Sequence, residues 1–430
     1  MTFVRSLMRF SRLAALVAAC PIMAAHGFTA AHYELHLRPD FAAKVLHGRA
    51  HIKLKADVNV GRAFELTSPA LEIFGAQLNG RELAVKKTIT GWQIPLTEAQ
   101  ATTANLDLTV DYRASANEGL VFGPQHVYTA FHTCQWMPCA GHDLSRASVE
   151  ISLALPQGYR SVGSGEPAAP AGEGSHRWSQ ALPYPLYTFG FSAGVFTEIS
   201  ATTSQPRLRY LGVNDDETAL HEKFKESAQV LAFLEGKAGV PMPHSTYTQV
   251  LLPGSVAQEV SSFSLIGKRM LDPILDDPQE DWVIAHEMAH LWWGNLITCA
   301  TWNEFWLNEG ITVFMTAAWK QHRWGAAAYQ HELSLARQRW QRAKDANFDK
   351  PLSWPGDYPN QDVKRAIHYS KGAVFMSVLR VEMGDEAFWN GLRRYTMDNA
   401  GRNVTASDLQ VAMQASTELD LKVLFDAWVY

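Results

Sequence analysis

Hydrophobic and polar residues alternate along the first half of the chain, from Ala31 to about residue 200. The segment HYELHL places its apolar residues on one face, and HIKLKADVNV, NLDLTVDY and VEISLALP continue the same period of two. Such alternation is typical of strands with one buried and one exposed face. We therefore expect residues 31–200 to form an N-terminal domain of antiparallel β-sheet, shaped as a saddle or a sandwich.

The period changes after the polar segment ATTSQP, residues 201–206, which we interpret as the domain boundary. Between residues 215 and 236 apolar side chains recur at helical spacing, at Leu220, Phe224, Ala228 and Leu231. Two strand-like segments follow, TYTQVLLP and SFSLIGKRML, and the rest of the chain has the pattern of helices. The predicted fold class is α+β, with a mainly helical second domain over residues 201–430.

The first 27 residues have a composition of their own. They hold three arginines, an apolar run that begins LAALVAAC, and a small-residue site that ends at Gly27. This order is typical of a secretory signal peptide, so we expect an exported protein, either periplasmic or secreted. An alternative interpretation takes VAAC as a lipoprotein site with Cys20 lipidated.

The remaining chain has the composition of an ordinary globular protein. Of its 430 residues 47% are hydrophobic, which is enough for the cores of two domains. The whole chain has 38 basic and 43 acidic residues, and loss of the leader removes three of the arginines, so nothing in the charge favours a nucleic-acid partner. No later stretch reaches the roughly 18 consecutive apolar residues that a transmembrane helix needs.

Three cysteines follow the leader. Cys134 and Cys139 are near enough in sequence for a disulfide, which an exported protein can form, and Cys299 would then be free. Two free thiols are the alternative for this pair. With His132 and His142 the pair also forms an HxCx4CxxH cluster that could hold a structural zinc ion, although its spacing is looser than in known zinc folds.

The strongest chemical signal is AHEMAHLWWGN, residues 285–295. The segment DDPQED upstream supplies capping residues from Asp277 onward, so a helix is expected to begin there. His286 and His290 are four residues apart and would lie one turn above each other, where both rings reach one ion. Glu287 would lie beside that ion without binding it, which is the position of a general base.

A catalytic zinc site needs a third protein ligand and an open position for water. Glu309 is the candidate, in the segment NEFWLNEG, on a second predicted helix that Asn303 can cap. Its neighbours in sequence are mostly large and apolar. A carboxylate buried in such a setting is costly without a partner, and zinc would be that partner.

His286, Glu287 and His290, followed by Glu309 inside WLNEG, resemble the zinc signature of the aminopeptidase N family of gluzincin metallopeptidases. The resemblance extends over most of the chain and implies a β-rich N-terminal domain before a thermolysin-like catalytic domain. It also implies one catalytic zinc ion, peptide substrates with a free N-terminus, and Tyr369 of IHYSKGAVF as a hydrogen-bond donor to the oxyanion. Glu287 would take a proton from zinc-activated water and deliver it to the leaving amine.

The chain departs from the family pattern in its amine-binding segment. Of the GAMEN motif only Ala257 and Glu259 remain, in VAQEV, and the segment before SLIG is longer than usual. We interpret Glu259 as the anchor of the substrate amine, because an ammonium group requires an acidic partner; a solvated loop residue is the alternative. No match for the family's second polar anchor stands at the expected distance before Pro138.

The chain ends where the family normally continues into a large helical domain, which predicts a short member with a more open cleft. An endopeptidase that accepts internal bonds is therefore one alternative function. A peptide-binding protein without turnover is an alternative of another class, although the intact set of ligands, base and tyrosine favours an enzyme. The segment GFSAG, residues 190–194, matches the GxSxG pattern of serine hydrolases, but both its flanks resemble strands, so Ser192 is interpreted as structural.

Overall fold

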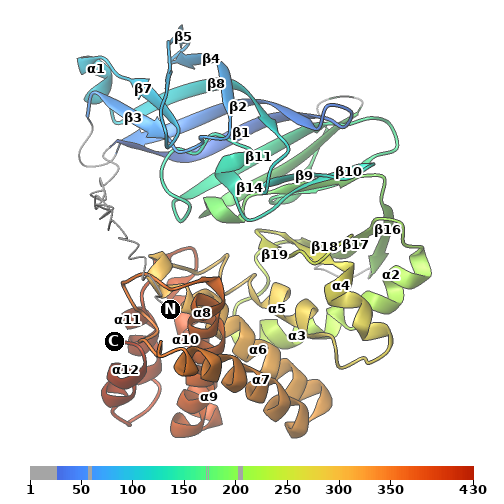
Figure 1. The fold of residues 1–430 in the computed structure, drawn as a ribbon, viewed down its shortest axis with the longest axis vertical. Helices are drawn as coiled ribbons and strands as arrows, with labels where there is room; N and C mark the ends of the chain where they lie inside the picture. The colour runs from blue at the N-terminus through green and yellow to red at the C-terminus, as the bar shows by residue number, and fades with distance from the viewer. Residues whose placement is uncertain (1–26, 57–60, 171, 173, 202–206) are drawn as a thin grey trace, which may run out of the picture.

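The computed structural model describes residues 27–56, 61–170, 172, 174–201 and 207–430, and it has a β domain and a mainly helical domain (Figure 1). The leader up to residue 26, with Cys20, lies outside the described residues, as do residues 202–206 of the expected boundary segment. The α+β class expected from the two hydrophobic periods is confirmed.

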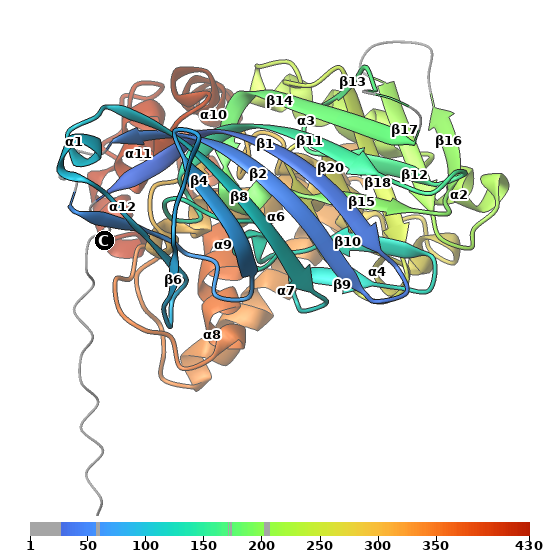
Figure 2. The same ribbon diagram turned by 90° about the horizontal axis from the view of Figure 1, so that it is seen from above.

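The largest sheet of the β domain has eight strands in the order β13-β14-β11-β1-β2-β8-β4-β5, and Figure 2 looks down on it. Tyr33, Leu35 and Leu37 of β1 are buried, as the alternation predicts. Strands β1 and β2 pair antiparallel, whereas β1 and β11 pair parallel. The strands are β1 Phe28–Asp40, β2 Val45–Ala56, β4 Glu72–Leu78, β5 Arg81–Glu82, β8 Asn105–Ser115, β11 Arg146–Ala154, β13 Glu166–Ala168 and β14 Ser175–Pro185.

Two smaller sheets complete the β domain, in the orders β12-β15-β10-β9 and β3-β7-β6. Ser192 lies in β15, and its buried hydroxyl is 3.4 Å from the Val127 carbonyl oxygen, which agrees with a structural role. Cys134 and Cys139 form a disulfide, and Cys299 is free and buried. The strands are β3 Ala63–Leu66, β6 Lys86–Lys87, β7 Trp92–Pro95, β9 Leu120–Phe122, β10 His126–Thr129, β12 Arg160–Gly163 and β15 Phe191–Gly194.

A five-stranded sheet in the order β16-β17-β18-β20-β19 begins the second domain. Its first strand ends at residue 201, so the segment expected as the domain boundary stands in sequence between β16 and β17, which pair with each other. Strand β19 lies at one edge, where only β20 pairs with it. The strands are β16 Thr197–Ala201, β17 Arg207–Gly212, β18 Thr246–Leu252, β19 Ala257–Val260 and β20 Phe263–Gly267.

Helices make up most of the remaining chain (Figure 1). They are α1 Glu98–Ala101 in the β domain, then α2 Glu217–Phe224, α3 Ser227–Ala238, α4 Lys268–Leu271, α5 Trp282–Ala289, α6 Trp306–Trp324, α7 Ala326–Asp345, α8 Gln361–Arg365, α9 Gly372–Met383, α10 Asp385–Asn399, α11 Ala406–Gln414 and α12 Lys422–Trp428. A short ladder joins β21 Thr298–Cys299 to β22 Asn403–Val404. None of the described helices is both long and apolar enough to cross a membrane.

Three expected helix boundaries are wrong. The single helix expected over residues 215–236 is divided into α2 and α3, with Ser227 of the second helix bonded to Gln249 of β18 at 2.6 Å. The zinc-signature helix begins at Trp282 and not after Asp277, because the Asp277 carboxylate accepts the Gln279 amide at 2.9 Å and closes a local turn.

The third error concerns α6, which was expected to start at an Asn303 cap. Residues Trp302–Glu304 instead form a 3₁₀ turn, and α6 follows at Trp306 without a side-chain cap. The errors at α5 and α6 have the same origin, since a polar residue before an apolar run satisfies the capping pattern whether or not a helix starts there.

Candidate metal centre and active site

The helix that carries the two histidines is short and almost fully buried. In α5 the residues Val283, Ile284, Ala285, Met288 and Ala289 have essentially no exposed surface, and the helix contacts α3 and α6. Packing on all sides therefore holds the helix, because eight residues are too few to be helical alone. His286 keeps 12% of its side chain exposed and His290 only 1%, so the two rings face a nearly closed space.

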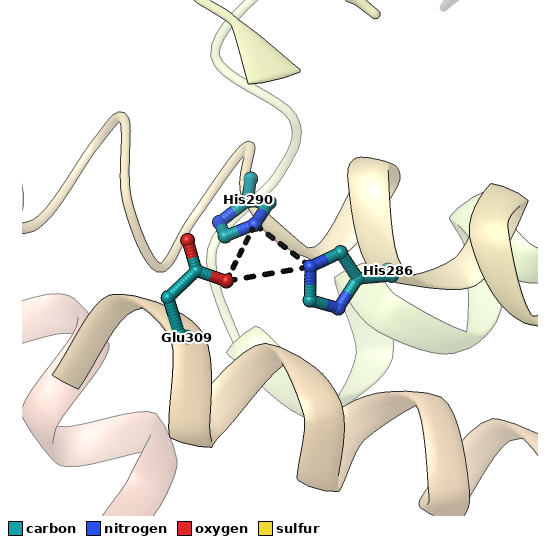
Figure 3. Close-up of side chains that lie close together, drawn as sticks. All are labelled: His286, His290 and Glu309. Carbon is teal, nitrogen blue, oxygen red and sulfur yellow. Dashed lines mark hydrogen bonds and ion pairs between the residues drawn. The ribbon is translucent and has the colours of Figure 1, made fainter. Parts of the chain in front are cut away.

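Glu309 in the first turns of α6 meets both rings (Figure 3). Its Oε2 atom lies 3.4 Å from His286 Nε2 and 3.5 Å from His290 Nε2, and the two Nε2 atoms are 3.3 Å apart. Glu309 Oε2 has no hydrogen-bond partner although it is buried. These two nitrogens and one oxygen thus form a small triangle of atoms that can each donate a lone pair, and no single proton can bridge all three of them.

This triangle fits a tetrahedral metal ion. Zinc binds histidine nitrogen and carboxylate oxygen at about 2.0–2.2 Å, and tetrahedral angles then place neighbouring ligand atoms about 3.4 Å apart. The three observed separations of 3.3, 3.4 and 3.5 Å match that edge length. Three protein ligands leave a fourth position open, which is the arrangement of catalytic zinc sites.

The orientation of His290 is fixed from behind. Its Nδ1 atom lies 3.0 Å from the Trp293 carbonyl oxygen, which can only accept, so Nδ1 carries a proton and Nε2 is the nitrogen that would give its lone pair to a bound metal ion. Gly294 follows with φ of 140°, and a Cβ there would lie 2.8 Å from His290 Nδ1. The glycine of the WWGN segment is therefore required by both backbone conformation and space.

Two further carboxylates share the buried site. Glu259 on β19 and Glu287 on α5 each place an oxygen within 4.8 Å of the other and of a His290 nitrogen. Burial raises the pKa of Glu287 well above its ordinary value, and the charges of Glu259 and Glu309 raise it further. Burial also raises the pKa of Glu259.

Three buried carboxylates also act on the histidine. Burial alone would lower the pKa of His290, but the charges of Glu259, Glu309 and Glu287 raise it to about 10. The pKa of Glu309 is lowered, because the close approach of the His290 and His286 side chains outweighs burial, which alone would raise it. The site thus has an excess of negative charge in a buried setting, which a divalent cation would balance.

Tyr369 projects toward the site from a π-helix, Ala366–Lys371. Its ring stacks against His286 at a centroid distance of 6.3 Å, and it is half-buried. Burial raises the pKa of Tyr369 well above its ordinary value, followed by the effects of the Glu309 and Glu259 charges. The phenol therefore keeps its proton and can donate a hydrogen bond at neutral pH.

The approach of Tyr369 to Glu309 depends on two glycines. A Cβ on Gly310 would lie 2.8 Å from Gly372 Cα and 3.0 Å from the His368 carbonyl oxygen, and a Cβ on Gly372 would lie 2.9 Å from Gly310 Cα. The backbones of the two helical segments are therefore in direct contact. This contact explains why Gly310 directly follows Glu309 and why Gly372 stands three positions after Tyr369.

Sequence reasoning missed a tyrosine that the β domain contributes. The Tyr187 hydroxyl donates to the Gly294 carbonyl oxygen at 2.9 Å and accepts from Asn308 Nδ2 at 3.0 Å. Its pKa is raised by burial and then by the charge of Glu259, which places the ring beside the amine-anchor candidate. The signal in sequence is weak, since an isolated tyrosine near a strand end is ordinary.

The structure therefore brings together all six residues that the sequence predicts for the site, namely Glu259, His286, Glu287, His290, Glu309 and Tyr369. Glu259 belongs to this group despite its altered motif. Within the described residues, both clusters able to share an ion lie here. The HxCx4CxxH segment of the β domain is not such a cluster, and its two cysteines are joined to each other.

Comparisons with known proteins agree with this geometry. Residues 222–428 match the model of the Peptidase family M1 domain. Among curated proteins, Leucine aminopeptidase 2 of Aspergillus oryzae is 25% identical over 330 residues, covering 70% of this chain and 51% of that protein. Aminopeptidase N of Lactococcus lactis subsp. lactis is 28% identical over 216 residues, covering 47% of this chain and 25% of that protein. The chain spans about half, or less, of the length of the curated relatives it matches.

Solved structures match over both domains. The M1 zinc metallopeptidase from Deinococcus radiodurans superposes with a TM-score of 0.78 at 22% identity, with 94% of each chain covered. Yeast LTA4 hydrolase superposes with a TM-score of 0.78 at 20% identity, with 94% of this chain and 68% of that chain covered. The family model and the metal-ligand geometry agree, and residues 222–428 of this chain form a Peptidase family M1 domain.

Proposed function

We propose that the protein is a zinc-dependent aminopeptidase that removes N-terminal residues from peptides. The observation that carries the proposal is the buried triangle of His286, His290 and Glu309, with Glu287 and Glu259 beside it. Support comes from the names of the curated relatives, several of which are called aminopeptidases. A structural relative from Deinococcus radiodurans is described as bound to a Tyr-Ser-Ala substrate.

The triangle of side chains would hold the zinc ion. Zinc bound there supplies a Lewis acid that polarises the scissile carbonyl and lowers the pKa of water. The protein's own contribution is a rigid and nearly dry setting, because α5 and α6 are packed on all sides and the ligand atoms are already at the required separations.

Glu287 is suited to carry the proton through the reaction. Its carboxylate is buried and its Oε2 has no partner, and burial raises its pKa well above the ordinary value, which makes the carboxylate a stronger proton acceptor. Glu287 would take a proton from the attacking water and deliver it to the nitrogen of the leaving amine. Tyr369 would donate its hydroxyl hydrogen to the oxyanion of the tetrahedral intermediate.

Glu259 is suited to bind the substrate amine. A divalent ion and three carboxylates leave one negative charge in excess, which the ammonium group of a free N-terminus would neutralise. An acetylated N-terminus offers no such charge and would leave Glu259 buried without a partner. The charge balance therefore favours cleavage one residue from a free N-terminus over cleavage of internal bonds.

The proposal is tested by turnover and zinc content measured on the same samples. Wild-type protein is compared with Glu287→Gln, and Glu280→Gln serves as a matched control because it makes the same change just before α5. We expect each protein to hold one zinc ion, and Glu287→Gln to lose about 10²–10⁴-fold in turnover of leucine p-nitroanilide. An active Glu287→Gln protein would show that Glu287 is not the general base.

We also infer that the protein is exported. The support is the leader-like composition of residues 1–27 and the disulfide between Cys134 and Cys139, a bond typical of oxidising compartments. Expression of the full chain in a bacterial host, followed by fractionation and N-terminal sequencing, tests this. A mature protein that begins after residue 27 in the periplasm or medium is the expected result, and an unprocessed cytoplasmic chain would contradict it.

A further inference from the structure

A hollow of about 390 Å³ lies between the β domain and the second domain, apart from the metal centre. Strands β12, β13 and β14 line it on one side, and β16, β17 and β18 line it on the other. In the five-stranded sheet β18, the lining strand nearest to β19, is two strand spacings from it, so the hollow lies at least about 10 Å from the edge that carries Glu259. It is thus no part of the proposed catalytic site.

The lining of this hollow is unusually basic. Four guanidinium groups line it, from Arg160, Arg177, Arg207 and Arg209. The lining includes a single carboxylate, that of Glu198. The protein as a whole has more acidic than basic residues, so this concentration of arginines does not reflect its general composition.

The arginines are not balanced by neighbouring acids. Glu198 is shared, because it lies 2.8 Å from Arg209 and 3.6 Å from Arg160. Arg177 pairs with Glu150, which is outside the lining, at 2.8 Å.

No carboxylate of the described residues lies within ion-pair distance of Arg207. Its side chain is exposed, and it stands two residues before Arg209 on β17, so both point to the same face of the sheet. Glu150 balances Arg177, and Glu198 balances one charge of the Arg160 and Arg209 pair. Two of the four positive charges therefore remain unbalanced.

Polar groups beneath the arginines are held in place. Ser161 is 3% exposed, and its hydroxyl lies 3.1 Å from His176 Nδ1 and 3.3 Å from Trp178 Nε1. Burial lowers the pKa of His176, and the charge of Arg160, which also lines the hollow, lowers it further. The Arg209 guanidinium lies over the Trp178 ring, 5.6 Å from its centroid, and is thereby held on the wall.

We propose that this hollow binds a phosphate group, with Arg160 and Arg207 as its principal ligands. A phosphate dianion matches the two unbalanced charges, and its oxygens accept hydrogen bonds from several directions, as guanidinium groups from opposite walls require. A carboxylate carries half that charge and engages one or two arginines in a plane. Because the walls belong to different domains, a bound phosphate also joins the domains.

Isothermal titration of the zinc-loaded full protein with inorganic phosphate, at constant ionic strength and pH 8, tests the proposal. Arg160→Gln and Arg207→Gln each remove one ligand. Both side chains are largely exposed, so neither change threatens the fold. Arg113→Gln is the matched control, since it removes an exposed strand arginine paired only with Glu72.

We expect each ligand variant to weaken phosphate binding at least about 10-fold, and the control to bind as wild type does. Any phosphate that binds at the metal centre contributes equally to the titrations of wild type and the arginine variants, so it does not affect their comparison. Absence of phosphate binding, or equal affinity in wild type and both ligand variants, would overturn the proposal. Acetate that binds as tightly as phosphate would overturn the phosphate assignment.

A second titration with glycerol 3-phosphate separates two sources of the group. Tighter binding of the monoester assigns the hollow to a phosphate ester, and tighter binding of inorganic phosphate assigns it to the free ion. Either result supports the site, provided that the arginine variants bind the preferred compound more weakly than wild type does. Neither measurement uses peptidase turnover, so its outcome is independent of the proposed aminopeptidase activity.

Discussion

Replacement of Arg146 by methionine is expected to loosen the two domains from each other. Arg146 begins β11 in the β domain, and its guanidinium reaches across to the second domain. It donates to the carbonyl oxygens of Asn295 and Leu296 at 3.2 Å, to Thr298 Oγ1 at 3.2 Å and to Asn403 Oδ1 at 3.3 Å. Residues 295–298 begin five residues after the metal ligand His290, so this contact also supports the metal centre.

The size of the effect follows from these contacts. The variant also loses a fifth bond, from Arg146 Nε to the Pro183 carbonyl oxygen at 3.1 Å within the β domain. The bonds are long for a charged donor, and the Leu296 carbonyl keeps a second donor from Gly401, so each is assigned about 1 kcal/mol, or about 4–5 kcal/mol in total. The average unfolding entropy of a chain of this length is about 0.9 kcal/mol/K, which converts the loss into a fall in Tm of about 4–6 °C.

The assay combines calorimetry with hydrogen exchange. Arg146→Met should lower Tm by the stated amount and speed exchange of the amides at 294–298. Arg113→Met is the control, because an exposed ion pair contributes little, and its Tm should change by less than about 1 °C. A change below about 1 °C for Arg146→Met, or faster exchange spread evenly over both domains, would refute this account of the interface.

Three further outcomes are expected. Glu259→Gln should raise KM for aminoacyl p-nitroanilides about 10–100-fold, because one charged hydrogen bond is lost, and an unchanged KM would exclude it as the anchor. Gly310→Ala should lower kcat more than it lowers zinc content, since the added Cβ would meet the Gly372 Cα and the His368 carbonyl oxygen; full activity would contradict the tight contact. Burial raises the pKa of Asp281 to about 6, so its protonated form is favoured on folding and its contribution to stability is present below about pH 4 and lost as pH rises through 6. Asp281→Asn should therefore gain on the order of 2–3 kcal/mol relative to wild type between pH 4 and pH 8, and parallel stability profiles of the two proteins would disprove this.

The metal ligands could be predicted from the sequence because helical spacing determines their geometry. Residues four apart on a helix must face one ion, whatever the rest of the fold does, and Glu309 was marked by its apolar neighbours. The β domain was similarly readable, since alternation directly reflects one buried sheet face. These features depend on neighbours in the chain, which the sequence contains.

Features that depend on contacts between distant segments could not be predicted. Tyr187 reaches Gly294 and Asn308 from another domain, and no local pattern marks it. The basic hollow gathers residues from six strands of two domains. The start of α5 at Trp282 was also missed, because the turn at Asp277 satisfies the same capping pattern as a helix does.

The most direct test of the central claim compares leucine p-nitroanilide with its N-acetyl derivative on zinc-loaded protein, with and without a chelator. The account predicts cleavage of the free-amine substrate alone, abolished by the chelator and restored by added zinc. Cleavage of both substrates at similar rates would show that the protein does not recognise the free amine and would favour an endopeptidase. Cleavage that survives metal removal would contradict the zinc centre itself.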